Sequence, residues 1–188
     1  MTIAAELRSL TVQEYHRIVE AGILAADERV ELIEGQLYTM AAKGTAHSAA
    51  VTRIDRVLSH QLAGRALLRF QDPVQLNNFS EPEPDVAIVH LNPLDYEDHH
   101  PRPEEIFWLI EVADSPLRRD RDIKVPLYGR SSIQEYWILD VQERYLYVFR
   151  EPGLEGYGSE QRLSEQETIV PLAFPDCLIQ VGEFLRRN

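Results

Sequence analysis

Residues 81–90 read EPEPDVAIVH and residues 106–114 read IFWLIEVAD, and these two apolar runs decide the fold. Both are rich in the β-branched and aromatic residues that favour strands. Asp85 stands at the start of the first run, and Glu111 stands near the end of the second. A buried charge costs roughly several kcal/mol unless it is paired or binds a metal. The two carboxylates are therefore the first candidates for a functional site.

The positions of the two carboxylates predict where they meet. If the two strands pair antiparallel, the start of one lies beside the end of the other, and Asp85 and Glu111 converge at one rim of the sheet. Two carboxylates about 4 Å apart repel by roughly 4 kcal/mol at an effective dielectric near 20. A divalent cation between them removes this repulsion, and oxygen ligands favour Mg²⁺ or Mn²⁺.

Composition indicates a single globular domain. The chain has 188 residues, 44% of them hydrophobic and 27% charged, which is ordinary for a soluble protein. The single Cys177 excludes an internal disulfide and fits a reducing compartment. The first residues have no basic segment followed by an apolar run, and no stretch reaches the roughly 20 apolar residues of a membrane span. We therefore expect a cytoplasmic protein without membrane association.

The net charge of −12 argues against a general nucleic-acid coat, but the charge is unevenly placed. The segment 118–130 contains Arg118, Arg119, Arg121, Lys124 and Arg130. Its arginines are candidates for contacts with a phosphate backbone. The alternative is that they neutralise nearby acidic residues.

The chain after Glu111 predicts a strand–helix–strand unit. Ser115 is a plausible N-cap, with Pro116 at the first helical position, and Pro126 should kink or split this helix. Residues 134–141 then form a strand, which we expect to lie parallel to the strand of Glu111 through a right-handed crossover. Residues 144–150 alternate and pair with that strand as a meander.

The rest of the sequence surrounds this unit with helices and short strands. Thr11 and Glu14 form a capping box at the start of the first helix. The expected elements are helices at 11–23 and 46–62, a hairpin at 30–40, strands at 67–70 and 74–76, and short strands with a hydrophobic tail at 177–185. The prediction is one α/β domain over residues 1–188, with a core at about 10–185. A central mixed sheet is flanked by helices, with an N-terminal hairpin and C-terminal strands added.

The ordered set of motifs resembles the PD-(D/E)XK nuclease superfamily, and the whole chain resembles its Uma-type restriction endonuclease family. The matching pieces are ELIEG at 31–35, His47, PD at 84–85, EVADSP at 111–116, the Asp120–Lys124 spacing, Tyr128 and EYWILD at 135–140. One departure is that the superfamily places a lysine two positions after the glutamate, where this chain has Ala113. The resemblance suggests that Lys124, on the following helix, takes its place.

The resemblance implies a restriction-endonuclease-like core and metal-dependent hydrolysis of nucleic-acid phosphodiester bonds, with DNA as the expected substrate. Asp85 and Glu111 would hold Mg²⁺, for which Mn²⁺ is a substitute, and the backbone carbonyl of Val112 would complete the ligand set. Lys124 would orient the attacking water or stabilise the charge on phosphorus. A homodimer is expected only by analogy with nucleases that cut both strands.

Each candidate residue also has a structural alternative. Asp85 can be a turn residue at a strand start, Glu111 an outward-facing strand residue, and Lys124 a surface partner of Asp120. Glu31 can add an acidic ligand or hold a metal-bound water, or can simply face outward. His47 can contact phosphate or order the site, or can make a local polar contact at its helix end.

For the remaining titratable and aromatic side chains we expect structural roles. Glu34 is expected on the hairpin surface, and His99 and His100 in a solvated loop. Trp108 and Trp137 are expected in the core. Two rival functions are a nucleic-acid-binding or interaction module that keeps the nuclease fold without cleaving, and a metal-dependent phosphohydrolase of small phosphate esters.

Overall fold

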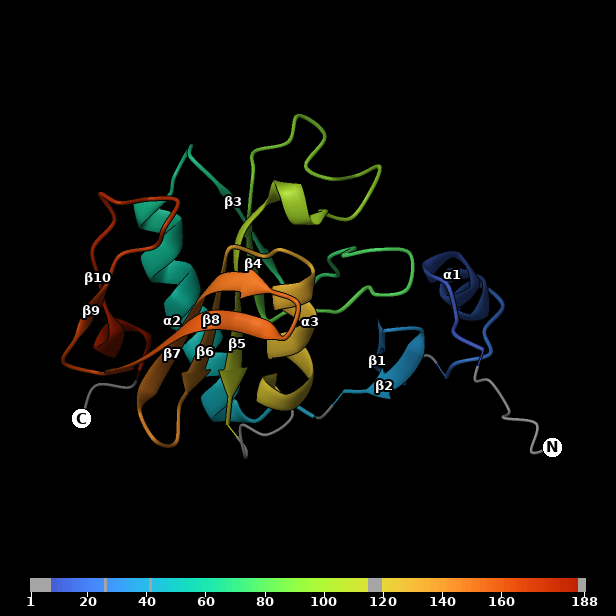
Figure 1. Cartoon of the computed structure of the whole chain (residues 1–188), viewed down its shortest axis with the longest axis horizontal. Coiled ribbons are helices and arrows are strands. Elements are labelled where there is room, and N and C mark those ends of the chain that lie inside the picture. Colours follow the sequence, from blue (N-terminus) through green and yellow to red (C-terminus); the bar gives the residue numbers. More distant parts are fainter. Residues whose placement is uncertain (1–7, 26, 41, 115–119, 186–188) are drawn as a thin grey trace.

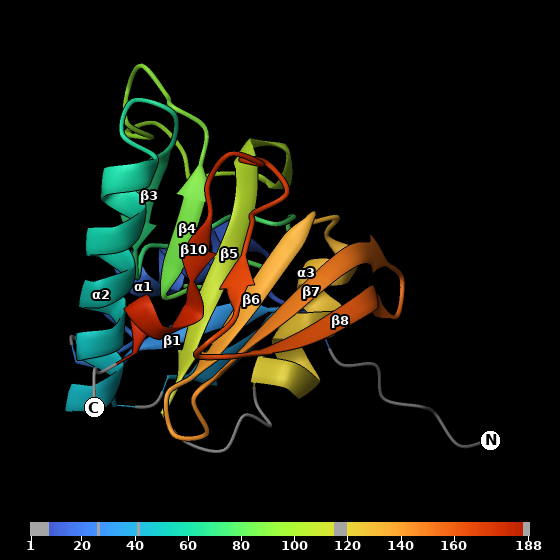
Figure 2. The ribbon, with the colours of Figure 1, turned by 90° about the vertical axis from the view of Figure 1, so that its left-hand side faces the viewer.

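A six-stranded mixed sheet forms the centre of the molecule (Figure 1; Figure 2). The computed structural model describes residues 8–25, 27–40, 42–114 and 120–185. The strands lie in chain order across the sheet: β3 (Leu67–Phe70), β4 (Val86–Val89), β5 (Ile106–Ala113), β6 (Glu135–Asp140), β7 (Tyr145–Gly153) and β8 (Gly156–Ser164). All neighbouring pairs are antiparallel except β5 and β6, which are parallel. The predicted mixed sheet, with its antiparallel and parallel pairs around Glu111, is confirmed.

Helix α2 (Thr45–Gln61) covers one face of the sheet, as Figure 2 shows. Its buried stripe packs against the side chains of β4, β5 and β6 that point to this face; the stripe consists of Ala50, Ile54 and Leu58, continued by Leu62 beyond the helix. Trp108 and Trp137 are fully buried there, which confirms their predicted place in the core. The small hairpin of β9 (Thr168–Ile169) and β10 (Ile179–Gln180) and the 3₁₀ turn η3 (Val181–Phe184) complete this layer.

The opposite face is covered by α3 (Val125–Arg130) and by the N-terminal hairpin of β1 (Val30–Ile33) and β2 (Gln36–Thr39) (Figure 1). A π-helical segment, η2 (Asp120–Lys124), leads into α3, and Pro126 lies in the first turn of α3. The helix therefore changes from π to α geometry just before Pro126, without a break in the helical residues. The predicted N-cap Ser115 and the following Pro116 lie outside the described residues.

The remaining helix, α1 (Val12–Glu20), begins at the predicted capping box: Thr11 accepts from the Glu14 N–H, and the Glu14 carboxylate accepts from the Thr11 N–H. A 3₁₀ turn, η1 (Pro103–Glu105), precedes β5. Across the described ranges, no helix is long and apolar enough to cross a lipid bilayer.

The predicted strand at 74–76 is wrong. Val74 and Leu76 are buried, but the N–H of Val74 donates to the carbonyl of Pro82 and that of Leu76 to the carbonyl of Ser80, around a tight turn. Pro73 and Pro82 lack N–H groups, so a regular ladder cannot extend through this segment. Its apolar side chains therefore pack from a loop. In contrast, β8 is longer than the short C-terminal strands that the sequence predicts.

Candidate active site

The register of β4 and β5 brings the two predicted carboxylates together. Val86 pairs with Ile110 and Ala87 with Leu109, so one further step of this register places Asp85 opposite Glu111. Directly opposed residues of an antiparallel pair point to the same face, here the face of α3 and the hairpin. Both side chains are buried. The alternative in which Glu111 faces outward is therefore wrong, and the predicted meeting at one sheet rim is confirmed.

Asp85 is fixed through one of its two carboxylate oxygens. The N–H of Val112 donates to Asp85 Oδ2 at 2.9 Å, and His47 Nε2 lies 2.9 Å from the same oxygen. Burial alone raises the pKa of Asp85, but the hydrogen bond and charge of His47, the Val112 N–H and the charge of Lys124 outweigh it. The net result is a pKa below the ordinary value, so the carboxylate is ionised at neutral pH.

Glu111 is held from α3 and the segment before it. Lys124 Nζ donates to Glu111 Oε1 at 2.7 Å, and the Tyr128 hydroxyl donates to the same oxygen at 3.2 Å. Lys124 is itself buried, so the alternative in which it lies on the surface is wrong. The lysine thus reaches the carboxylates although Ala113 occupies the usual lysine position in the sequence.

Glu31 joins the same cluster from the N-terminal hairpin. Its Oε2 lies 3.4 Å from Lys124 Nζ and accepts from the N–H of Glu83 at 3.2 Å. The backbone bridge between Leu32 and Glu81 ties β1 to the segment that leads into Asp85. Glu31 is buried, so the outward-facing alternative is wrong. All five predicted side chains, Glu31, His47, Asp85, Glu111 and Lys124, therefore gather in one place.

Lys43 was missed by the sequence analysis. Its Nζ is buried and lies 3.8 Å from Asp85 Oδ1 and 3.9 Å from Glu83 Oε1, and no described residue accepts a hydrogen bond from it. Burial lowers the pKa of Lys43, against the opposing effect of the Asp85 charge. Burial likewise raises the pKa of Glu83, whose carboxylate also pairs with Arg29. No sequence signal marked Lys43, because it lies among small residues between two elements.

The chemistry of the cluster fits a hard divalent cation. Four carboxylates (Glu31, Glu83, Asp85 and Glu111) face two lysines, with Arg29 at the edge. Within the described ranges, no three His, Cys, Asp or Glu side chains are placed to hold a metal ion by themselves. Mg²⁺ in proteins is usually bound by one or two carboxylates together with waters and substrate phosphates, and Asp85 and Glu111 are two carboxylates at one rim of the sheet.

The other basic and histidine candidates lie outside this cluster. Arg121 pairs with Glu160, and Arg130 pairs with the exposed Glu34 at 2.6 Å, so both neutralise acidic residues. Arg118 and Arg119 lie outside the described residues. His99 lies within 2.7 Å of Asp98 and 3.2 Å of Glu105, and both His99 and His100 are half-buried. Both histidines remain partly exposed in this loop, as the sequence predicts.

The sheet, its flanking helices and the carboxylate–lysine cluster define a mixed α/β protein with a nuclease-like core. A crystal structure from Anabaena variabilis ATCC 29413, described as "a putative nuclease belonging to DUF820", has the same fold. Its TM-score is 0.70 at 15% sequence identity, and the match covers 93% of this chain and 97% of that chain. The chain belongs to the Uma2 family, described as "Putative restriction endonuclease", whose sequence profile matches residues 12–182. No curated protein matches the chain.

Proposed function

We propose that the protein is a metal-dependent endonuclease that hydrolyses phosphodiester bonds of nucleic acid, with DNA as its substrate. One observation carries the proposal: Asp85, directly before β4, and Glu111, in β5, lie buried at one rim of the sheet, with Lys124 Nζ 2.7 Å from Glu111 Oε1. Membership of the Uma2 family supports the nuclease class. The cation would be Mg²⁺, with Mn²⁺ as a substitute, held by Asp85 and Glu111 and by the carbonyl of Val112.

When bound, the cation would polarise a phosphoryl oxygen and lower the pKa of an attacking water. The protein's own groups supply position and charge. Lys124 provides a compact ammonium beside Glu111, suited to orient the water or to offset the negative charge that develops on the phosphoryl group. His47 and the Val112 N–H fix the Asp85 carboxylate through Oδ2. Glu31 holds Lys124 from the hairpin side.

The cluster favours an enzyme over a module that binds nucleic acid without cleaving it. Removing charged groups from water is costly unless they are paired with good geometry, and a domain that only binds has no need of buried carboxylates and lysines. This chain keeps Glu31, Asp85, Glu111 and Lys124 buried together. A small-ester phosphohydrolase would use the same chemistry, and substrate length decides between the two.

The test is cleavage of plasmid DNA and of a labelled single strand in Mg²⁺ or Mn²⁺ by the wild type, Asp85→Asn and Glu111→Gln. We expect metal-dependent cutting that both variants lose by at least about a hundredfold, because each removes a proposed ligand. Glu34→Gln is the matched control, since it neutralises an exposed carboxylate on the hairpin turn. Equal cutting by all four proteins would identify a contaminant. A wild type that cuts neither DNA substrate but hydrolyses bis-p-nitrophenyl phosphate would favour the small-ester reaction.

A further inference from the structure

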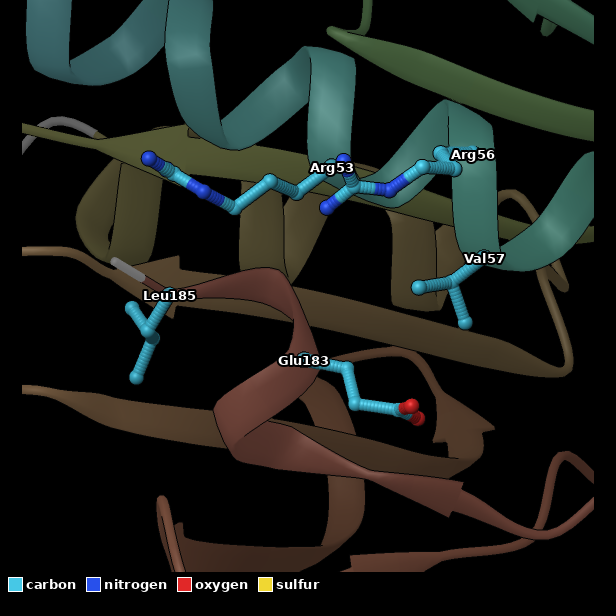
Figure 3. Close-up of a pocket in the computed structure, with 5 residues that line it drawn as sticks. All are labelled: Arg53, Arg56, Val57, Glu183 and Leu185. Atoms are coloured by element: carbon cyan, nitrogen blue, oxygen red, sulfur yellow. The ribbon is translucent and has the colours of Figure 1, made fainter. Parts of the chain in front are cut away.

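Two adjoining hollows run along one flank of α2. One, of about 510 Å³, lies between the first half of α2, including Thr45 and Arg53, and Val141 and Gln142 at the turn after β6. The other, of about 440 Å³, lies between Arg53 and Arg56 on α2 and Glu183 near the C-terminal end. Arg53 and Leu185 line both hollows, so they form one depression, the α2 groove. Figure 3 shows the two arginines on the helix side and Glu183 and Leu185 across from them.

One end of the α2 groove lies near the rim of the sheet at which the carboxylates meet, on the face that α2 covers, whereas the carboxylates point to the opposite face. Thr45, at one end of the groove, stands two residues before His47, whose ring contacts Asp85 at 2.9 Å. The N–H of Val141, on the opposite wall, donates to the carbonyl of Ala113 at 3.0 Å, two residues beyond Glu111. The groove therefore leads away from the rim of the sheet at which the carboxylates meet.

The groove contains two guanidinium groups, those of Arg53 and Arg56. Among the described residues, no carboxylate lies within ion-pair distance of Arg53 or Arg56, although Arg53 is half-buried and the chain has a net charge of −12. Asp55 is the only acidic residue in α2, and it accepts from Ser59. Two like charges one helical turn apart repel each other, so this placement is unfavourable for the protein alone. Such an arrangement suits a polyanionic ligand.

The spacing of the arginines fits a chain of phosphates that starts near this rim of the sheet. With a rise of 1.5 Å per residue, Arg53 and Arg56 stand roughly 9 Å and 14 Å from His47 along the helix axis. We propose that the α2 groove binds the sugar–phosphate backbone of the nucleic acid beyond the bond that is cut, with Arg53 and Arg56 on phosphate oxygens. This inference rests on the proposed nuclease function and adds the path of its substrate. The carboxylate of Glu183, on the opposite wall of the groove, repels the phosphates and so weakens this binding.

Binding can be measured apart from cleavage. The probe is a fluorescein-labelled DNA duplex of about 30 base pairs, titrated by anisotropy in Ca²⁺ and in EDTA over a series of NaCl concentrations, with gels to check that the duplex stays intact. The test protein is Arg53→Gln/Arg56→Gln. Its matched control, Arg17→Gln/Arg65→Gln, removes the same net charge from α1 and from the turn after α2, where Arg65 pairs with Asp176.

Each phosphate contact on duplex DNA contributes about 0.9 to the slope of log affinity against log salt. We expect the groove variant to bind more weakly, with a slope smaller by about 1.8, while the control keeps the wild-type slope. Glu183→Gln should bind more tightly than the wild type. Equal slopes for the groove variant and the wild type would contradict DNA binding in the α2 groove and leave the nuclease proposal intact. A wild type that does not bind the duplex would also contradict DNA binding in the α2 groove. The cleavage assay then decides the nuclease proposal separately.

Discussion

At the scale of single residues, Asp85 shows how the fold prepares one oxygen of a carboxylate. Oδ2 receives the Val112 N–H and the His47 ring, whereas Oδ1 faces Lys43 at 3.8 Å. Hydrogen bonds to an ionised group are stronger than those between neutral groups. These contacts exist only in the folded chain, so the ionised form of Asp85 is favoured by folding.

A first prediction concerns the pH dependence of stability. Because the folded-state pKa of Asp85 is lowered below its ordinary value of 3.8, its contribution is fully present above that value and is lost as the pH falls through the folded-state pKa. Asp85→Asn, which does not titrate, should be less stable than the wild type by about 1.5–3 kcal/mol at neutral pH. The difference should shrink below about pH 4. Urea unfolding in EDTA across this pH range measures it.

The outcome that contradicts this prediction is an Asp85→Asn variant that is more stable than the wild type at neutral pH. Repulsion from Glu31, Glu83 and Glu111 would then outweigh the donors on Oδ2 in the metal-free protein. Glu34→Gln is the control, since Glu34 is exposed and stands on the hairpin turn, and its effect on stability should be small at every pH.

The sequence predicted Asp85 and Glu111 because each charge bordered or interrupted an apolar run, and burial of such a charge demands a reason. It did not predict Lys43, which stands in a short segment of small residues before α2 and meets Asp85 only through the tertiary fold. Local pattern contains no information about such a contact. His47 was indicated by its place in a motif, but its contact with Asp85 likewise needs the docking of α2 on the sheet.

At the scale of elements, the position of α3 depends on a close approach to β8. A Cβ atom on Gly129 would overlap the backbone of Gly156, including its carbonyl oxygen, so only glycine allows the helix to lie this near to the strand. The residue before Gly129 is Tyr128, whose hydroxyl donates to Glu111. The contact between α3 and β8 thus helps to place a group of the candidate site.

A second prediction follows for Gly129→Ala. The added methyl group meets backbone rather than a flexible side chain, so α3 must move away from β8, and we expect a loss of about 3 kcal/mol in the free energy of unfolding. Chemical denaturation measures this loss. Gly153→Ala is the matched control, because its Cβ would meet nothing nearer than the Gly156 oxygen at 3.9 Å, and it should cost far less. Equal losses in the two variants would contradict the close approach.

The elements were mostly predictable from periodicity, turn residues and caps. The capping box of α1, the hairpin, α2 and the order of strands around Glu111 all follow patterns that are local in sequence. The predicted strand at 74–76 is wrong because Val74 and Leu76 fill the core from a loop, which is held by backbone hydrogen bonds to residues 80–82. The length of β8 was missed because its alternation is weak, with polar residues along most of the strand.

At the scale of the whole molecule, the net charge of −12 has two unfavourable consequences. Self-repulsion destabilises the compact state, and it also repels a polyanion from most of the surface. Cations in solution relieve both effects. Screening depends on ionic strength, whereas binding at the proposed metal site would depend on Asp85 and Glu111.

The third prediction separates screening from site binding through thermal unfolding in NaCl and in MgCl₂ at matched ionic strength. Both salts should raise the midpoint, and Mg²⁺ should raise that of the wild type further, because it binds the folded state. At a concentration one hundred times its dissociation constant, a bound ligand adds about 2.7 kcal/mol, which in a domain of this size corresponds to roughly 5–10 °C. The excess should vanish in Asp85→Asn/Glu111→Gln and persist in the control Glu34→Gln/Glu104→Gln, which removes two exposed carboxylates elsewhere. An equal excess rise of the midpoint in both double variants would place Mg²⁺ on the acidic surface at large. No excess in the wild type would mean that the two opposed carboxylates do not bind Mg²⁺ without substrate. Since Mg²⁺ sites in proteins are commonly completed by substrate phosphates, repeating the measurement with the DNA duplex present distinguishes a site that forms only with substrate from one that does not form.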